Sequence, residues 1–256
     1  MTKDTSGHGG STVRIDGNGL HYRELNRVIR EAVAEGAQRI DLHGVHGQRY
    51  IATNLRGQAE IHIHGTPGND LGAFLDGSKL IVHGNAQDGC GNTMNEGEII
   101  VHGHAGDITG LSARGGRIFI REDVGYRAGI HMKEYGDKRP ALVIGGTAQD
   151  FLGEYMAGGI VVVLGLTLNG ENCHRASFVG TGMHGGVIYV RGRINEHQLG
   201  KEVGVSRLTR KDRAILRDLV TQFAAHFGFD AEEILANRFV KLVPLYLRPY
   251  GRLYTY

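Results

Sequence analysis

A short apolar segment that ends in glycine recurs along most of this chain, and it limits the fold more than any other feature. The clearest copy is Leu80–His83, which is followed by Gly84. The steps between the closing positions of successive copies are 21, 19, 19, 19, 23, 20 and 27 residues. Such steps are typical of a solenoid whose turns carry insertions of different lengths. The copies are Ile40–Gly44, Ile61–Gly65, Leu80–Gly84, Ile99–Gly103, Ile118–Glu122, Ala141–Gly145, Val161–Gly165 and Ile188–Gly192.

Apolar residues alternate within each copy. The first and third positions are aliphatic or Ala throughout, whereas the second and fourth vary. This period of two predicts a short strand with one buried face. Because so short a strand cannot bury its face alone, we predict that the copies stack in parallel, about 4.8 Å apart. The result would be an all-β fold, a right-handed parallel β-helix of about eight coils. Its core columns would be Ile40, Ile61, Leu80, Ile99, Ile118, Ala141, Val161 and Ile188, and Leu42, Ile63, Val82, Val101, Ile120, Val143, Val163 and Val190.

Composition supports a solenoid and argues against several other classes. Glycine provides 41 of the 256 residues, about twice its usual share of roughly 7%, as expected where corners need positive φ. The intervals between strands are rich in Gly, Asn and Asp, which disfavours a Rossmann or TIM-barrel fold. The net charge of +2 gives no argument for nucleic acid, and no apolar run is long enough for a membrane span. Because Cys90 and Cys173 are isolated and no secretory signal is evident, we expect no disulfide framework and a cytoplasmic protein.

The two flanks have different patterns from the solenoid. Apolar residues at helical spacing predict an amphipathic helix that ends at Gly36 and caps the first coil. Thr209, with Asp212 three positions later, predicts a second helix that ends at Gly228 and precedes a shorter one. From Phe239 the chain is apolar without helical spacing, so we predict an extended tail that packs on the chain's own last coils or reaches a partner. The predicted domains are 1–37, a disordered start and capping helix; 38–200, the parallel β-helix; and 201–256, a helical extension and apolar tail.

Histidine occupies the fourth position of the first, second, third and fourth copies. We predict that these rings stack on the outer surface at the strand spacing and that crowding lowers their pKa values below the usual 6.5 or so. A metal track or a proton relay is the alternative function. A parallel stack disfavours metal binding, because ligands must converge on one ion at about 2.1 Å. The predicted ladder consists of His43, His64, His83 and His102.

A candidate partner interface combines a basic corner with apolar residues of this outward column. The segment Gly125–Lys133 brings Tyr, Arg, His and Lys together, and a solvated basic loop is the alternative interpretation. Two later copies have an aliphatic fourth residue, and apolar side chains on an outer face are usually covered by something. The interface residues predicted in this way are Tyr126, Arg127, His131, Lys133, Ile144 and Leu164.

The most polar corner lies between Gly84 and Gly97. Its side chains could hold a cation or a carboxamide. Asn and Asp also tolerate left-handed backbone and bind their own backbone, which tight corners require, and we favour this structural role. No nucleophile triad, phosphate loop or paired-cysteine motif accompanies it, so we predict no catalytic, cofactor-binding or metal-binding residue in this chain. The corner residues are Asn85, Gln87, Asp88, Asn92 and Asn95.

The glycine corners also carry a resemblance to a known family. Several unrelated corners match in order and at matching intervals, from about Tyr22 to Gly192, which makes the resemblance specific. The sequence resembles the GXGXG domain, the C-terminal β-helix of the glutamate synthase large subunit. The matching segments are Gly65–Phe74, Gly84–Gly89, Gly91–Asn95, Gly125–Arg127, Gly129–Met132, Val143–Gly146 and Asp150–Gly159.

The resemblance implies a structural role in nitrogen metabolism. It suggests a non-catalytic subunit of a glutamate-synthase-like oxidoreductase complex, which serves glutamate biosynthesis. The expected partners are a class II glutamine amidotransferase and a flavin-dependent synthase, with FMN and iron–sulfur clusters on those partners. An alternative is the equivalent scaffold of a formylmethanofuran dehydrogenase or formyltransferase/hydrolase complex, and a free-standing β-helix enzyme that acts on carbohydrate is the third hypothesis.

Overall fold

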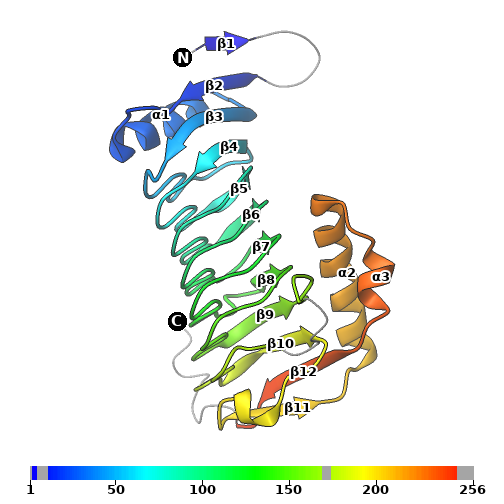
Figure 1. Ribbon diagram of the computed structural model, residues 1–256. Helices are drawn as coiled ribbons and strands as arrows, with labels where there is room; N and C mark the ends of the chain where they lie inside the picture. Colours follow the sequence, from blue (N-terminus) through cyan, green and yellow to red (C-terminus); the bar gives the residue numbers. More distant parts are fainter. Residues whose placement is uncertain (1, 5–10, 169–173, 247–256) are drawn as a thin grey trace.

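The computed structural model describes residues 2–4, 11–168 and 174–246, which form a parallel β-helix (Figure 1). One strand of each turn pairs in parallel with the equivalent strand of the next turn, from β2 to β10. The inward side chains of these strands form one continuous core. The strands are β2 (Thr12–Asp16), β3 (Arg39–His46), β4 (Glu60–Thr66), β5 (Asp76–Val82), β6 (Glu96–Val101), β7 (Arg117–Ile120), β8 (Ala141–Ile144), β9 (Ala157–Val163) and β10 (Gly185–Arg191).

The strand register confirms the predicted core columns from β3 to β7 and again in β9 and β10. In β8 the prediction was wrong by one residue. Leu142 rather than Ala141 lies beside Ile118, and Ile144 lies beside Ile120 in the core. All four residues of β8 are apolar and two glycines follow them, so neither alternation nor the closing glycine specified the register. A shift of one residue exchanges the two faces of a strand.

Each turn closes through a corner in which three alternate residues have positive φ. The middle residue of the three faces the core. A Cβ on Gly72 would lie 2.7 Å from Cδ1 of Ile99, so glycine is required there by space as well as by φ. The described residues contain seven such corners, one between each pair of successive strands from β3 to β10. The predicted eight coils were counted from eight strands, whereas the solenoid has about six turns, and β10 is followed by a 3-10 helix (Glu196–Gln198) in place of another corner.

Further elements lie at the two ends of the stack. At the N-terminal end, α1 (Tyr22–Ala34) contributes Leu25 and Ile29 to the core. At the same end, β1 (Thr2–Asp4) pairs antiparallel with β2, although the start of the chain was predicted to be disordered. At the C-terminal end, β12 (Phe239–Pro244) pairs antiparallel with β10 and with β11 (Val203–Ser206). The predicted extended tail therefore packs on the chain's own last strands over 239–244, while residues 247–256 lie outside the described part.

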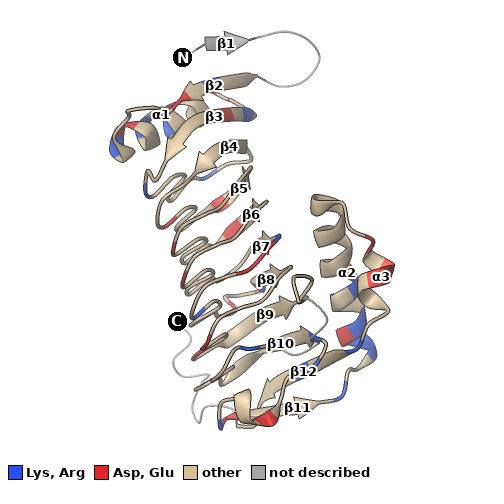
Figure 2. Ribbon diagram, viewed as in Figure 1, with Lys and Arg blue, Asp and Glu red and all other residues tan. Residues whose placement is uncertain are grey.

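Two helices cover the outer face of the later strands (Figure 1). They are α2 (Arg210–Phe227), with Thr209 as N-cap and Gly228 as left-handed C-cap, and α3 (Ala231–Leu235). The charge pattern explains why these strands are covered (Figure 2). β8 and β9 carry no charged residue, whereas each strand from β3 to β7 carries at least one. A second apolar cluster thus lies between α2 and the outer face. Its members include Ile100, Phe119, Val143, Val162, Leu164, Tyr189, Leu219, Val220 and Phe223.

Candidate functional site

The corners stack into one long edge of the solenoid, which we call the corner face. The first and third left-handed residues of each corner point away from the glycine-rich middle column. Their backbone N–H groups bond to the next turn, as in Arg127 N to Asp150 O at 3.0 Å and His131 N to Glu154 O at 3.0 Å. The middle residue bonds to the preceding turn, as in Gly129 N to Thr109 O at 2.8 Å. The first column is Tyr50, Asp70, Gly89, Ile108, Arg127, Phe151 and Phe178, and the third is Asn54, Phe74, Thr93, Ser112, His131, Tyr155 and Gly182.

Side chains of neighbouring turns stack along the corner face. The rings of Phe151 and Phe178 lie 5.0 Å apart at an interplanar angle of 10°, and those of His131 and Tyr155 lie 5.5 Å apart at 11°. The guanidinium of Arg127 lies 4.8 Å from the centre of the Phe151 ring. These five residues form what we call the corner strip. Phe178 is 53% exposed and Tyr155 is 48% exposed, so the strip presents aromatic surface to solvent.

A groove continues the corner strip towards the N-terminal turns. It has a volume of about 240 Å³ and is lined by Ser112, Arg114, His131, Lys133 and Tyr135. Its lining includes two cationic side chains and no carboxylate. Within the part of the chain that the structure describes, neither Arg114 nor Lys133 forms an ion pair. The groove is therefore suited to a group with negative charge.

The predicted basic corner is one continuous surface, whereas the predicted apolar wall is not exposed. Arg127, His131 and Lys133 all lie on the corner face, and Tyr126 beside them is 46% exposed. Ile144 is fully buried inside the solenoid, because of the register of β8. Leu164 does face outward, but it is fully buried in the cluster beneath α2. The expectation that these two residues form an exposed wall was wrong, because the chain covers this face itself.

The polar corner supports the backbone of neighbouring turns. The side-chain oxygens of Asn85 and Asp88 accept hydrogen bonds from the backbone N–H groups of His104 and Asp107, each at 2.9 Å. Asn92 donates to the carboxylate of Asp70 at 2.9 Å. Gln87 is exposed and Asn95 is half-buried. The same device recurs in later turns, where Asp107 accepts from Tyr126 N at 2.8 Å and Asp150 from Ser177 N at 2.8 Å. These contacts favour the structural role over a ligand site.

The predicted histidine ladder lies on the outer face of the first strands. His43 and His64 stack at 4.3 Å and 6°, and His64 and His83 stack at 4.5 Å and 11°. His102 follows at 5.5 Å from His83 and meets the edge of Phe227 at the end of α2, at 5.1 Å. Burial and then the neighbouring imidazoles lower the pKa values of His64 and His83. For His102, burial and then Arg121 lower the pKa.

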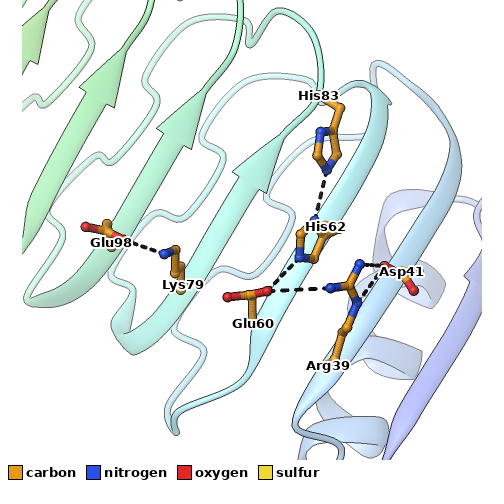
Figure 3. Close-up of polar contacts among 7 residues, drawn as sticks. All are labelled: Arg39, Asp41, Glu60, His62, Lys79, His83 and Glu98. Atoms are coloured by element: carbon orange, nitrogen blue, oxygen red, sulfur yellow. Dashed lines mark hydrogen bonds and ion pairs between the residues drawn. The ribbon is translucent and has the colours of Figure 1, made fainter. Parts of the chain in front are cut away.

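A second polar row lies beside this ladder (Figure 3). His62 Nε2 lies 2.7 Å from a Glu60 oxygen, and His62 Nδ1 lies 2.9 Å from His83 Nε2. Arg39 joins the row through Asp41 at 2.9 Å and Glu60 at 3.8 Å. The chain Glu60–His62–His83 is a geometry through which a proton can pass along the surface. The strand repeat does not predict this row, because His62 occupies the second strand position, where the copies carry unrelated residues such as Asp41 and Ile81.

Neither surface has the geometry of a metal centre. Among the residues that the structure describes, no group of three or more His, Cys, Asp or Glu side chains could hold a metal ion. The thiol of Cys90 is fully buried, and burial raises its pKa to about 12, so it is a poor nucleophile. No described helix is long and apolar enough to cross a membrane. Stacked aromatic rings, unpaired cations and a groove are features of a binding surface.

The aromatic part of the corner strip also escaped the sequence analysis. Phe151, Tyr155 and Phe178 belong to later turns that are separated by long insertions, so their equivalence to Arg127 and His131 is not evident from a fixed period. An alignment of the corners on their middle glycines would have placed them in register.

The chain is thus a solenoid with one face that it covers itself and one edge that exposes aromatic and basic side chains. Comparison with known proteins then identifies the family. The GXGXG motif family matches residues 29–247, and this is the family of the domain found in the glutamate synthase large subunit. The chain therefore belongs to the GXGXG motif family. It is also 47% identical over 251 residues to an uncharacterized protein of Methanocaldococcus jannaschii, with 95% of this chain and 96% of that protein covered.

Proposed function

We propose that this chain is a non-catalytic scaffold subunit of a multi-subunit glutamate-synthase-like enzyme. The observation that carries the proposal is the family match over residues 29–247, which occupies most of the chain. In this proposal, an amidotransferase partner releases ammonia from glutamine, and a flavin-dependent partner uses it to make glutamate or a related amino acid. The chain would hold the two partners in a fixed arrangement, which a rigid solenoid can do.

The residues of this chain support placing the cofactors on partner subunits. Iron–sulfur clusters are held by several cysteine thiolates, whereas this chain has two cysteines. One of them, Cys90, is fully buried in the core with a raised pKa. The donor set of this chain therefore does not fit such a cluster. The exposed corner strip supports the scaffold role, because stacked aromatic rings next to cations are typical of protein interfaces.

Reconstitution with candidate partners tests the proposal. The chain would be co-expressed with the amidotransferase and the flavin-dependent synthase from the same genome, and the mixture separated by size-exclusion chromatography. We expect the three polypeptides to elute together and to form glutamate from glutamine and 2-oxoglutarate. We expect this chain alone to contain no flavin or iron and to hydrolyse no glutamine.

The same experiment has outcomes that contradict the proposal. If the purified chain alone turns over glutamine or retains flavin, the non-catalytic role is wrong. If it elutes instead with an amidohydrolase-like subunit from the same genome, the formylmethanofuran-type complex is the better assignment. As a control, Lys211→Glu changes an exposed residue of α2, which covers the outer face and not the corner face, and it should leave complex formation unchanged.

A further inference from the structure

Bulky side chains occupy strained backbone positions on the corner face. Phe151, Tyr155 and Phe178 have φ values of 64°, 51° and 58°. This left-handed region is unfavourable for residues with a Cβ and is natural for glycine, as in the middle column of the same corners. Strained positions of this kind persist where the surrounding structure holds them, and they cluster at functional sites. Every corner of the solenoid has these φ values, but other corners also fill the same positions with Asp, Asn, Ser, Thr or Gly, so the fold does not require aromatic side chains there.

The rings are held in place before any partner arrives. Phe151 stacks on Phe178 and beneath the guanidinium of Arg127, which is itself fixed by Glu154 at 2.9 Å. Tyr155 stacks on His131 and lies against Gly182, where a Cβ would collide with its ring. An ordered aromatic surface loses little conformational entropy when it binds. The corner strip is therefore preorganised for contact with apolar groups.

The charges next to the corner strip favour one kind of binding partner. Arg114 and Lys133 line the groove without an ion pair in the described part of the chain. The carboxylates around the groove are engaged, because Glu96 bonds Lys138 at 2.6 Å and Glu134 bonds Arg139 at 2.8 Å. Asp137 is exposed on the adjoining loop but does not line the groove.

We propose that the corner strip and the groove together bind an extended, acidic segment of a partner protein. Carboxylates of that segment would pair with Arg114 and Lys133, and its apolar side chains would pack on Tyr155 and Phe178. The inference deepens the proposed scaffold function by stating how one partner is recognised. A second copy of this chain, bound symmetrically through the same surface, would place like charges in opposition. The chain's own residues 247–256 carry two arginines and no acidic side chain, so they do not match the groove.

Site-specific photocrosslinking in the intact complex of the native host tests this inference. The variant Tyr135→p-benzoylphenylalanine places the crosslinker at the groove, on a side chain that is 53% exposed. Tyr246→p-benzoylphenylalanine is the control, because Tyr246 is 75% exposed and does not line the groove. Mass spectrometry identifies the captured peptide. We expect the Tyr135 variant, and not the control, to capture a peptide of another polypeptide that is rich in Asp and Glu.

A binding measurement with that captured segment, made as a labelled synthetic peptide, completes the test. Arg114→Glu and Lys133→Glu should each weaken the Kd at least about tenfold, because each replaces attraction by repulsion, and added salt should weaken binding further. Lys211→Glu, on the exposed side of α2, should leave the Kd unchanged. A thermal melt of each variant verifies that it is folded.

Four outcomes would overturn the inference: capture of a second copy, capture of residues 247–256, capture of a segment without excess acidic residues, or no capture. The failure of this inference can be distinguished from failure of the scaffold function. If the amidotransferase and synthase co-purify but nothing is captured at Tyr135, the scaffold function stands and the docking groove is wrong. If the acidic segment belongs to an unrelated polypeptide, the groove stands and the scaffold function is wrong.

Discussion

Asp212 joins α2 to two strands through both of its carboxylate oxygens. Tyr189 of β10 donates to Oδ1 at 2.5 Å, and Lys241 of β12 donates to Oδ2 at 2.9 Å. The hydroxyl of Thr209 donates to the same Oδ2 at 2.6 Å, which also completes the cap of α2. Burial would raise the pKa of Asp212, but the hydrogen bonds from Thr209, Tyr189 and Lys241 outweigh it and lower the pKa well below its usual range. One residue thus positions the helix that covers the outer face.

Asp212→Ala should destabilise the protein by about 3 kcal/mol, because it leaves a largely buried lysine without its partner. Asp218→Ala is a suitable control, since Asp218 pairs with Arg117 at a solvent-exposed site and its removal should change the free energy of unfolding by less than about 1 kcal/mol. Urea unfolding measures both. The folded-state pKa of Asp212 is lowered, so its contribution is present above the unfolded pKa of about 3.9 and is lost as the pH falls through the folded value. Equal losses for the two variants would contradict this role.

At the scale of the elements, the outer rows of β3 to β6 bring like side chains into contact. The parallel register places His43, His64, His83 and His102 in one column, where protonation of one ring disfavours that of the next. The end of α2 contacts this column, since Phe227 meets His102 and His226 Nε2 lies 3.3 Å from Glu98. Protonation of the ladder is therefore coupled to the packing of α2.

Stability should fall as the pH drops from about 7 to 5. The pKa values of His64, His83 and His102 are lowered in the folded state, so the unfolded chain binds more protons. The stabilisation is complete above the unfolded pKa of about 6.5 and is lost as the pH falls through and below it. Thermal melts measure the effect. The double variant His64→Asn and His83→Asn should show a smaller loss than the wild type between these pH values. The control His46→Asn removes an exposed histidine outside the ladder, so it should lose as much stability as the wild type between these pH values. If all three proteins lost the same amount of stability, the ladder would not be the source of the loss.

At the scale of the whole molecule, the chain divides its outer wall into a polar half and an apolar half. The polar half, on β3 to β5, needs no cover because its charged residues pair with each other, as Lys79 does with Glu98 of β6 at 3.1 Å. The apolar half, from β6 to β10, is covered by α2 and α3. The boundary falls between Ile81, which is half-buried, and Ile100, which is 2% exposed. The apolar wall is thus covered by the chain itself, whereas the corner face stays exposed.

Ile100→Asp should cost about 3 kcal/mol or more, because it buries an unpaired carboxylate beneath α2. Ile81→Asp is the matched control at the equivalent position of the preceding turn, and it should cost about 1 kcal/mol. Leu164→Asp should resemble Ile100→Asp and lower the Tm of the isolated chain strongly, since Leu164 lies under the same helix cluster. If all three variants melted like the wild type, α2 would not cover this wall in solution.

The repeated strand motif determined the architecture by itself. Short alternating strands with glycine corners can bury their apolar faces only by stacking, and the helix signals at Thr209, Asp212 and Gly228 depend on local hydrogen bonds that sequence encodes directly. The resemblance of the corners to the GXGXG family was visible for the same reason, because each corner is a local structure.

The tertiary structure alone decided three other things: the register of β8, the burial of Leu164 and the corner strip. Each depends on which residues of distant turns or of α2 become neighbours. No local pattern carries that information when four successive residues are apolar, as in β8, or when insertions separate equivalent corners, as in the corner strip.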